Sequence, residues 1–397
     1  MTKDEAQRRR WTFCEAVKVD MPQDVICIAR SRLHRNRANL IQTLQTAAAF
    51  GAIGVQVRLY LPPWSRRTVV AARLGELGIR AALDLRSSQF LHSRWQFLGF
   101  RPFIVAHRAE LRSAGALYTR SPEISAALAS AGMPHHLEVH EVSHLRKGGL
   151  LERLIEWHRS GVIKWLVPIS HAAAAALREA GAATERIHVS PCGVDLDAYR
   201  NVVPFDGNRL DQPRILYVGR ISRDRGLGIF QALAEHGLGE LTLVGEQEDS
   251  VLPCTGLRIE PFVPHRDVPR WYGRADVVLL PYQQDLRHAD SLSPMKLFEA
   301  MAAGRPIIAS DLQPLREILE HGKTALLVEP DRLEAWVAAI ATLRNDRALA
   351  ARLASGAKAL ASRFSWRERA LGIARALGWD FAESPGEGKG GVTGPLT

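Results

Sequence analysis

Residues 291–310, SLSPMKLFEAMAAGRPIIAS, predict a turn, a helix and a buried strand in direct succession. Pro294 stands where the first helical residue is expected, and Ser293 before it is a suitable N-cap. Apolar residues recur at helical spacing until Gly304, and the proline two residues later cannot continue the helix. The apolar run PIIAS then predicts a short buried strand. Helices that alternate with buried strands are typical of α/β folds.

The first two turns of this helix carry groups that suit a ligand with an anionic part and a hydroxyl-bearing part. The backbone N–H groups at Ser293 and Met295 and the positive end of the helix dipole attract phosphate. Lys296 and Glu299 project to the same side of the helix, where Glu299 can accept hydrogen bonds from sugar hydroxyls. A surface helix with an ordinary Lys/Glu pair is the alternative interpretation of this stretch alone.

Composition narrows the class of protein. A chain of 397 residues exceeds one comfortable hydrophobic core, so two domains are expected. The hydrophobic fraction of 46%, with both charge signs present, indicates a globular rather than a disordered protein. No apolar run reaches the roughly 20 residues that span a bilayer, and none near Met1 resembles a signal peptide. The four cysteines are scattered without zinc-type spacing, so we expect a cytoplasmic protein with reduced thiols.

The net charge of +10 favours an acidic partner. Nucleic acid, anionic lipid and phosphorylated substrates all qualify, and a solvated basic surface without a partner is the alternative. Residues 86–108, RSSQFLHSRWQFLGFRPFIVAHR, combine arginines and large aromatic residues with no acidic residue. This mixture suits an anionic membrane surface or stacking on single-stranded nucleic acid. An ordinary helix whose aromatic residues pack inward accounts for it equally well.

Two series of alternating strands and helices organise the chain. We expect a charged N-terminal extension over 1–23, a first Rossmann-like domain over 24–200, a second over 206–363, a last helix within 364–383 and a disordered tail over 384–397. The predicted strands lie at 24–30, 55–63, 79–85, 114–119, 135–140 and from 186 in the first series, and at 214–220, 241–246, 257–263, 275–282, 306–310 and 325–330 in the second. Ligands of such sheets bind at the carboxyl ends of the strands, which places the expected site in a cleft between the domains.

The strand ILYVG leads into the loop GRISRDRG at 219–226. Glycine lets the backbone approach a ligand closely, and the two arginines Arg220 and Arg225 can clamp a diphosphate. A strand-end turn with solvent-facing arginines is the alternative. The loop has neither the spacing of a Walker A motif nor that of the NAD fingerprint, so neither of these nucleotide sites is predicted.

A family resemblance emerges from the order of the motifs. GRISRDRG, LVGE, PFVPHRDVPRWYGRADVVLLPY and SPMKLFEAMAAGRPIIASDLQPLREIL together resemble the donor-binding domain of the family-four retaining glycosyltransferases (glycosyl transferases group 1), in the wording of a bacterial polysaccharide-type subgroup. SPCGVDLDAY resembles that family's interdomain NGVD element, with Cys192 where asparagine is usual, and FSWRERA resembles the helix that crosses back to the first domain. The resemblance implies an α/β protein of the GT-B fold, in which two Rossmann-like doubly wound domains face a central cleft.

The resemblance also implies a donor site. Arg220 matches the family's phosphate-binding arginine, Arg225 replaces its lysine partner, and Glu299 matches the second glutamate of an E-x7-E pair, which holds the donor ribose. The first glutamate of that pair would fall at Ser291, so either Ser291 or Asp290 is left to replace it. The residues assigned to donor binding are Gly219, Arg220, Arg225, Val263, Ser293, Met295, Lys296 and Glu299, with Phe262 beside Val263 at the nucleobase.

The acceptor side carries fewer signals. The family often has a histidine that lines the donor sugar, and His140, just past a strand of the first domain, is the candidate. A structural histidine is the alternative. The predicted catalytic residues are therefore His140, Arg220, Arg225 and Glu299. On the acceptor side, the strand ends and the loop SRLHRNRAN contribute Arg35, Asn36, Arg120 and Glu141.

The function that follows from the resemblance is transfer of a sugar from a nucleoside-diphosphate sugar to a glycan, lipid-linked or small-molecule acceptor, with retention at the anomeric carbon. Its expected setting is bacterial polysaccharide or cell-envelope glycan synthesis at the cytoplasmic face of the membrane. Because two arginines and a helix N-terminus would stabilise the departing diphosphate, we expect no metal and no cofactor beyond the donor. A GT-B nucleotide-sugar epimerase or phosphorylase and a basic nucleic-acid-binding protein that reuses the fold are the alternatives.

Overall fold

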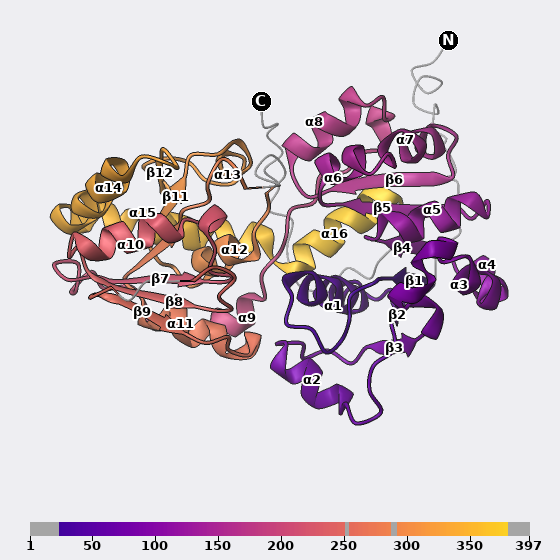
Figure 1. Ribbon diagram of the computed structural model, residues 1–397, viewed down its shortest axis with the longest axis horizontal. Coiled ribbons are helices and arrows are strands. Elements are labelled where there is room, and N and C mark those ends of the chain that lie inside the picture. Colours follow the sequence, from indigo (N-terminus) through magenta and orange to yellow (C-terminus); the bar gives the residue numbers. More distant parts are fainter. Residues whose placement is uncertain (1–23, 251–253, 287–291, 380–397) are drawn as a thin grey trace, which may run out of the picture.

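The structure, a computed structural model, describes residues 24–250, 254–286 and 292–379. The predicted extension at 1–23 and the predicted tail at 384–397 lie outside these residues, as do Asp290 and Ser291. The described chain forms two lobes, each organised around one six-stranded sheet (Figure 1).

The first sheet has the strand order β3-β2-β1-β4-β5-β6, and each neighbouring pair is parallel. Its strands are β1 (Asp24–Ile28), β2 (Gln56–Leu61), β3 (Asp84–Ser87), β4 (Ala116–Thr119), β5 (His135–Val139) and β6 (Ile163–Pro168). The helices of this lobe are α1 (Ala38–Ala52), α2 (Val70–Glu76), α3 (Arg101–Ala106), α4 (Arg108–Ser113), α5 (Pro122–Ser130), α6 (Val142–Lys147), α7 (Leu151–Arg159) and α8 (His171–Glu179).

The second sheet repeats this order as β12-β11-β10-β7-β8-β9, again with parallel neighbours. Its strands are β7 (Arg214–Val218), β8 (Glu240–Val244), β9 (Leu257–Glu260), β10 (Val277–Leu280), β11 (Ile307–Ser310) and β12 (Leu326–Val328). The helices from the connecting segment onward are α9 (Leu196–Tyr199), α10 (Leu227–Glu235), α11 (Val268–Arg274), α12 (Met295–Ala302), α13 (Gln313–Arg316), α14 (Leu333–Asn345), α15 (Arg347–Ala361) and α16 (Trp366–Leu377). Both sheets have the doubly wound order, which confirms the predicted pair of Rossmann-like units.

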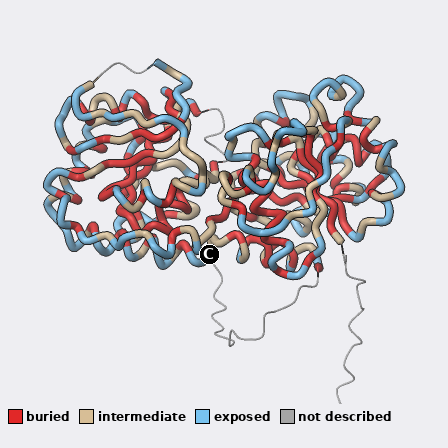
Figure 2. Tube along the Cα trace, turned by 90° about the horizontal axis from the view of Figure 1, so that it is seen from below, coloured by how far each residue is buried: buried red, intermediate tan, exposed pale blue. Residues whose placement is uncertain are grey.

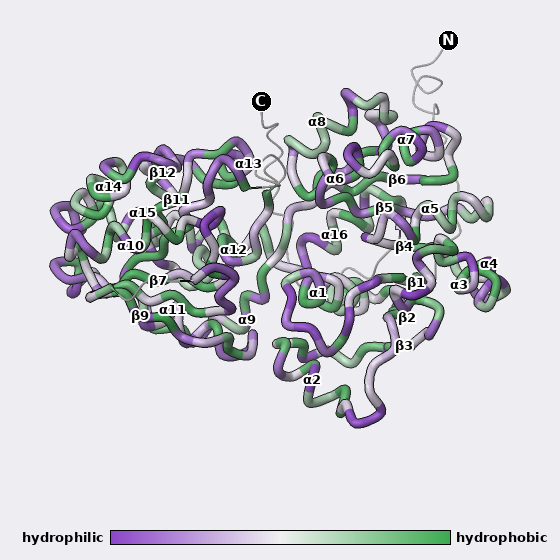
Figure 3. Tube along the Cα trace, viewed as in Figure 1, coloured by the Kyte–Doolittle hydropathy of each residue, from purple (hydrophilic) through white to green (hydrophobic). Residues whose placement is uncertain are grey.

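Apolar runs form these strands because helices cover both faces of each sheet. β10 and β11 are buried along their whole length. Figure 2 shows buried segments through the middle of each lobe, with exposed segments around them. In Figure 3 hydrophobic residues follow the same interior, and hydrophilic residues mark the outer helices and loops. Each lobe therefore has its own packed sheet, and the loops at the strand ends remain available for a site.

The strand predictions succeeded better in the second lobe than in the first. All six strands predicted there are present. In the first lobe the strand predicted at 79–85 forms only from Asp84, and β6 was missed. The strand predicted from residue 186 is wrong. His188 and Ser190 donate backbone hydrogen bonds to β6, but the next N–H on that side, that of Cys192, donates to the hydroxyl of Ser293 instead.

The helix predicted from Pro294 begins one residue later than expected. α12 starts at Met295, and Pro294 has extended backbone in the N-cap position. The hydroxyl of Ser293 is not a cap, because it accepts a hydrogen bond of 3.0 Å from the backbone N–H of Cys192, in the segment that joins the lobes. The predicted end is confirmed, since Gly304 follows the last turn with φ of +61°.

The last helix, α16, leaves the second lobe and packs against the first (Figure 1). Its Arg369 places Nη2 2.9 Å from Oε2 of Glu138 on β5, and Nη1 donates to Thr46 of α1 at 3.0 Å. Burial alone would raise the pKa of Glu138, but the charge of Arg369 holds it well below its ordinary value. A buried ion pair thus fastens the end of the described chain to the first sheet.

Replacing Arg369 with methionine is expected to lower the free energy of unfolding of the first lobe by about 3–5 kcal/mol, because the Glu138 carboxylate is left buried without its cation. Urea denaturation followed by circular dichroism measures the loss. The exposed neighbour Glu368 provides the control, and Glu368→Gln should change stability by less than about 0.5 kcal/mol. Adding Glu138→Gln to Arg369→Met should recover part of the loss. A loss below about 1 kcal/mol in the single variant would contradict this account of the pair.

Candidate active site

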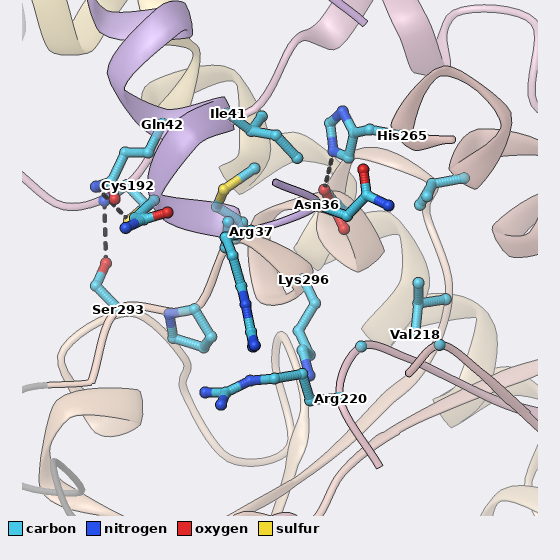
Figure 4. Close-up of a pocket in the computed structure, with 18 of the residues that line it drawn as sticks. Asn36, Arg37, Ile41, Gln42, Cys192, Val218, Arg220, His265, Ser293 and Lys296 are labelled. Atoms are coloured by element: carbon cyan, nitrogen blue, oxygen red, sulfur yellow. Dashed lines mark hydrogen bonds and ion pairs between the residues drawn. The ribbon is translucent and has the colours of Figure 1, made fainter. Parts of the chain in front are cut away.

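A cavity of about 390 Å³ opens between the two lobes (Figure 4). Its lining comes from segments that follow β1, β4, β5 and β6 in the first lobe and β7, β8, β9 and β10 in the second, with Cys192 from the segment that joins the lobes. Strand order reverses between β1 and β4 and between β7 and β10, and ligands of doubly wound sheets bind at such points. The volume falls within the range of small-molecule sites.

Two glycines shape the part of the cavity that follows β7 and β8. Gly219 has φ of +145°, and a Cβ there would lie 2.3 Å from Nζ of Lys296. Gly245 has φ of +152°, and its Cβ would lie 2.0 Å from the carbonyl oxygen of Gly219. Neither position can carry a side chain without displacing its neighbours. The missing side chain at Gly219 leaves room for the Lys296 amine, which lies 2.7 Å from the hydroxyl of Tyr217.

Three basic side chains bring positive charge to this end of the cavity. Burial, assisted by the charge of Arg225, lowers the pKa of Lys296 well below its ordinary value. Arg225 is buried and pairs with Asp224 at 3.1 Å, whereas the half-exposed Arg220 pairs with Glu248 at 3.0 Å. A bound anion would favour the charged form of Lys296. The arrangement therefore suits an anionic group.

Glu299 lies one turn along α12 and is held by His265. Nε2 of His265 is 2.8 Å from Oε1 of Glu299, and the other ring nitrogen is 3.2 Å from the carbonyl oxygen of Leu77 in the first lobe. Burial alone would lower the pKa of His265, but the hydrogen bond and charge of Glu299 raise it. The hydroxyl of Tyr272 is 3.4 Å from the second oxygen of Glu299. The carboxylate is thus fixed in position and keeps lone pairs for a ligand.

His140 and Arg120 belong to the wall supplied by the first lobe. Nε2 of His140 is 2.6 Å from Oε1 of Glu138. Burial and the charge of Arg120 lower the pKa of His140 to about 4, so the ring is neutral at pH 7. With Nε2–H donating to the carboxylate, Nδ1 is the hydrogen-bond acceptor of the ring. Arg120 donates to the carbonyl of Asn39 at 3.0 Å and to the side chain of Gln42 at 2.9 Å.

Hydrogen bonds at Cys192 tie the two walls together (Figure 4). Nε2 of Gln42 is 3.0 Å from Sγ of Cys192, whose backbone N–H donates to Ser293. Burial raises the pKa of Cys192 to about 11. The thiol therefore stays protonated at neutral pH, and the residue joins the lobes rather than serving as a nucleophile.

The cavity brings together all the predicted donor-binding residues and most of those predicted on the acceptor side. They are Gly219, Arg220, Arg225, Val263, Ser293, Met295, Lys296 and Glu299, with Asn36, Arg120, His140 and Glu141. Arg35 is the exception, because it lines a more open neighbouring pocket of about 680 Å³. The placement of these residues is established, and their roles stay predictions.

Several cavity residues escaped the sequence analysis. His265 lies inside a motif that the resemblance uses, but nothing local indicates that its ring reaches Glu299. Gln42, which lines the cavity, belongs to a predicted helix, where the pattern marks it only as part of that element. The same holds for Tyr217 in a predicted strand, which is outside the lining but lies 2.7 Å from Lys296. Their contacts join residues far apart in the chain, which no spacing rule detects.

The aromatic and basic segment 86–108 contributes nothing to the cavity lining. Phe100 is fully buried, and Phe90 packs on Trp95 with the ring centroids 5.4 Å apart. Phe97 and Val105 are instead 80% and 74% exposed. Inward packing therefore accounts for most, but not all, of the large apolar side chains in this segment.

The described residues contain neither a membrane-spanning helix nor a cluster of metal ligands. Among them, no helix combines the length and hydrophobicity that a bilayer crossing requires. Within the same residues, no three His, Cys, Asp or Glu side chains are grouped so that they could hold a metal ion. The predicted independence from metal stays a prediction.

The second lobe matches a known protein family. Residues 212–346 match the family model described as glycosyl transferases group 1. A D-inositol 3-phosphate glycosyltransferase of Xylanimonas cellulosilytica is 32% identical over 220 residues, which are 49% of this chain and 51% of that protein. The amylovoran biosynthesis glycosyltransferase AmsK of Erwinia amylovora is 28% identical over 201 residues, which are 46% of this chain and 48% of that protein. The chain thus spans about half the length of the curated relatives it matches.

Solved structures resemble almost the whole chain. HepE of Anabaena, in complex with UDP and glucose, has a TM-score of 0.68 at 19% identity, covering 90% of this chain and 99% of that one. Sucrose-phosphate synthase of Thermosynechococcus elongatus has a TM-score of 0.70 at 19% identity, covering 89% and 98%. The predicted GT-B fold is confirmed by these likenesses.

Changing Gly245 to alanine is expected to destabilise the second lobe by about 2–3 kcal/mol, because its φ is unfavourable for other residues and the new Cβ meets backbone. Gly228 on α10 is the matched control, since a Cβ there meets nothing within 4 Å. Gly228→Ala should leave stability unchanged or raise it by up to about 1 kcal/mol. Equal effects of the two substitutions in thermal unfolding would contradict this reading of Gly245.

Proposed function

We propose that this chain, whose residues 212–346 are a glycosyl transferases group 1 domain, is a glycosyltransferase that moves a sugar from a nucleoside-diphosphate sugar to an acceptor hydroxyl with retention of anomeric configuration. The observation that carries the proposal is the interlobe cavity, in which Arg220, Arg225 and Lys296 lie at one end with Glu299 further along α12. Such a cavity offers cations for a diphosphate and a carboxylate for ribose hydroxyls.

The charges that develop during transfer explain why these groups are needed. The bond between the anomeric carbon and the diphosphate oxygen breaks, leaving negative charge on the diphosphate and positive charge on the sugar ring. Arg220, Arg225 and Lys296 stabilise the departing diphosphate electrostatically. The acceptor oxygen bonds to the anomeric carbon on the face from which the diphosphate leaves, and its proton passes to the diphosphate. This mechanism needs no protein nucleophile.

His140 and Glu299 position the two sugars of the donor in this proposal. The neutral ring of His140 accepts a hydrogen bond from a hydroxyl of the transferred sugar through Nδ1, because Nε2 is engaged with Glu138. Glu299 accepts hydrogen bonds from the ribose. Both side chains are oriented before a ligand arrives, since each has a hydrogen-bonded partner in the protein.

The names of similar proteins guide the choice of substrates to test. UDP in the HepE structure favours UDP-sugars as the first donors. The inositol phosphate and amylovoran enzymes favour a phosphorylated polyol or a polysaccharide precursor as acceptor, in bacterial glycan synthesis in the cytoplasm. Product analysis separates the alternatives. An epimerase yields a new nucleotide sugar, a phosphorylase yields a sugar phosphate, and a transferase yields a glycosylated acceptor with free nucleoside diphosphate.

Arg220→Ala and Arg225→Ala are each expected to lower kcat/KM by about 100-fold, the usual effect of removing one charge-stabilising group. Release of nucleoside diphosphate is measured with UDP-, GDP- and ADP-sugars and inositol phosphate, and proton NMR of the product reports the anomeric configuration. Arg223 is the matched control, because it is exposed between the two arginines and does not line the cavity. Arg223→Ala should stay within about twofold of wild type. Near-normal rates in both cavity variants, with their folds intact, would contradict the proposed site.

We further propose that Phe97 and Val105, with the exposed arginines around them, bind an anionic membrane surface where lipid-linked acceptors reside. Phosphatidylglycerol vesicles should float the wild-type chain at low salt and release it at high salt. Phe97→Glu should lower the floated fraction several-fold. Val69, also exposed but remote in sequence, provides the control Val69→Glu, which should have no effect. Flotation that both variants reduce equally would assign the binding to charge alone.

A further inference from the structure

A shared carboxylate joins the two lobes beside the cavity. Oε1 of Glu248, in the segment that follows β8, lies 3.0 Å from Nη1 of Arg220 and 3.4 Å from Nη1 of Arg37. Arg37 occupies the N-cap position of α1 in the first lobe. Figure 4 shows Arg37 pointing from its loop across the cavity towards Arg220. Two arginines from different lobes thus converge on one anion.

The surroundings of Arg37 favour an anion as well. α1 has no side-chain cap and no acidic residue in its first turn, so its N-terminal end adds positive potential at Arg37. Arg37 and Arg220 both line the cavity. Arg32, in the same loop, instead donates to Ser93 at 2.9 Å and lies outside the cavity lining. Arg37 is therefore the arginine that the loop directs to the cavity.

Another anion can replace Glu248 as the partner of Arg37 and Arg220. The side chains of Arg37, Arg220 and Glu248 are 42%, 41% and 33% exposed, and ion pairs this open to water contribute little to stability. Partial burial alone would raise the pKa of Glu248, but the hydrogen bonds of Arg220 and Arg37 lower it, so the group is ionised at neutral pH. A diphosphate presents more charge and more acceptor oxygens than one carboxylate.

We propose that Arg37 binds the diphosphate of the donor and that Glu248 occupies the place of that diphosphate until the donor arrives. This inference rests on the proposed function and extends it to the first lobe. In the donor complex Glu248 is displaced, and the diphosphate contacts Arg37 as well as the cations of the second lobe. The donor is consequently held by both lobes at once.

Binding of the full chain to UDP, GDP and ADP tests the proposal by isothermal titration calorimetry at fixed ionic strength. For whichever diphosphate binds wild type, Arg37→Gln is expected to raise Kd at least fivefold. The matching nucleoside, measured by competition, should stay within twofold, because Arg37 contacts only the phosphates. Glu248→Gln is expected to lower Kd for the diphosphate at least threefold, since a competing anion is gone.

Two variants with the same charge changes serve as controls. Arg32→Gln removes an arginine of the same loop, and Glu240→Gln removes a carboxylate at the other end of β8, where it is 69% exposed. Both should leave Kd for the diphosphate within twofold of wild type. They separate a local contact from a change in the overall charge of the chain.

The possible results distinguish this inference from the function on which it rests. A diphosphate that binds wild type and Arg37→Gln equally well would overturn the role of Arg37. Weaker binding to Glu248→Gln would overturn the role of Glu248, because that carboxylate would then position Arg220 rather than compete for it. If wild type binds none of the three diphosphates, the proposed function and the inference fail together.

Discussion

The ion pair between Glu138 and Arg369 holds α16 on the first lobe, and one wall of the cavity depends on it as well. The two side chains are 2% and 3% exposed, so each charge is tolerated only beside the other. Arg369 belongs to the helix that returns from the second lobe, and Glu138 also fixes the ring of His140. The same buried carboxylate therefore anchors α16 and sets the tautomer of a histidine in the cavity.

At the other end of the cavity, each of the three basic side chains has its charge balanced or suppressed separately. Lys296 has a lowered pKa, Arg225 pairs with Asp224, and Arg220 pairs with Glu248. Each of these arrangements is local, and Glu248 reaches Arg220 but is not paired with Arg225 or Lys296. One polyvalent anion would contact all three basic side chains together and favour the charged form of Lys296. The proposed donor has this property, which connects the electrostatics of the cavity to the function that we infer.

Sequence reasoning succeeded where function depends on local patterns. The second lobe was predicted strand by strand, since its short apolar runs alternate with helices and end at glycine or proline. The predicted donor residues all lie at these strand and helix ends. The failures have long-range causes. Ser293 does not cap α12, and its hydroxyl instead accepts a hydrogen bond from Cys192, which is far away in sequence. The contact between Arg37 and Glu248 joins residues 211 positions apart. No periodicity encodes such contacts.

The chain passes between the lobes twice, near Val194 and again at the start of α16, and these two segments pair through their backbones. The N–H of Val194 donates to the carbonyl of Phe364 at 2.9 Å, and the N–H of Trp366 donates back to Val194 at 3.2 Å. This pairing requires glycine at position 193, because a Cβ there would lie 2.8 Å from the ring of Trp366. The two segments are therefore held to each other beside Cys192, which lines the cavity. The exposed contact at Glu248 is a further and weaker link between the lobes. A donor held by both lobes would replace this weak link with a stronger one, because a diphosphate presents more charge and more acceptor oxygens than one carboxylate.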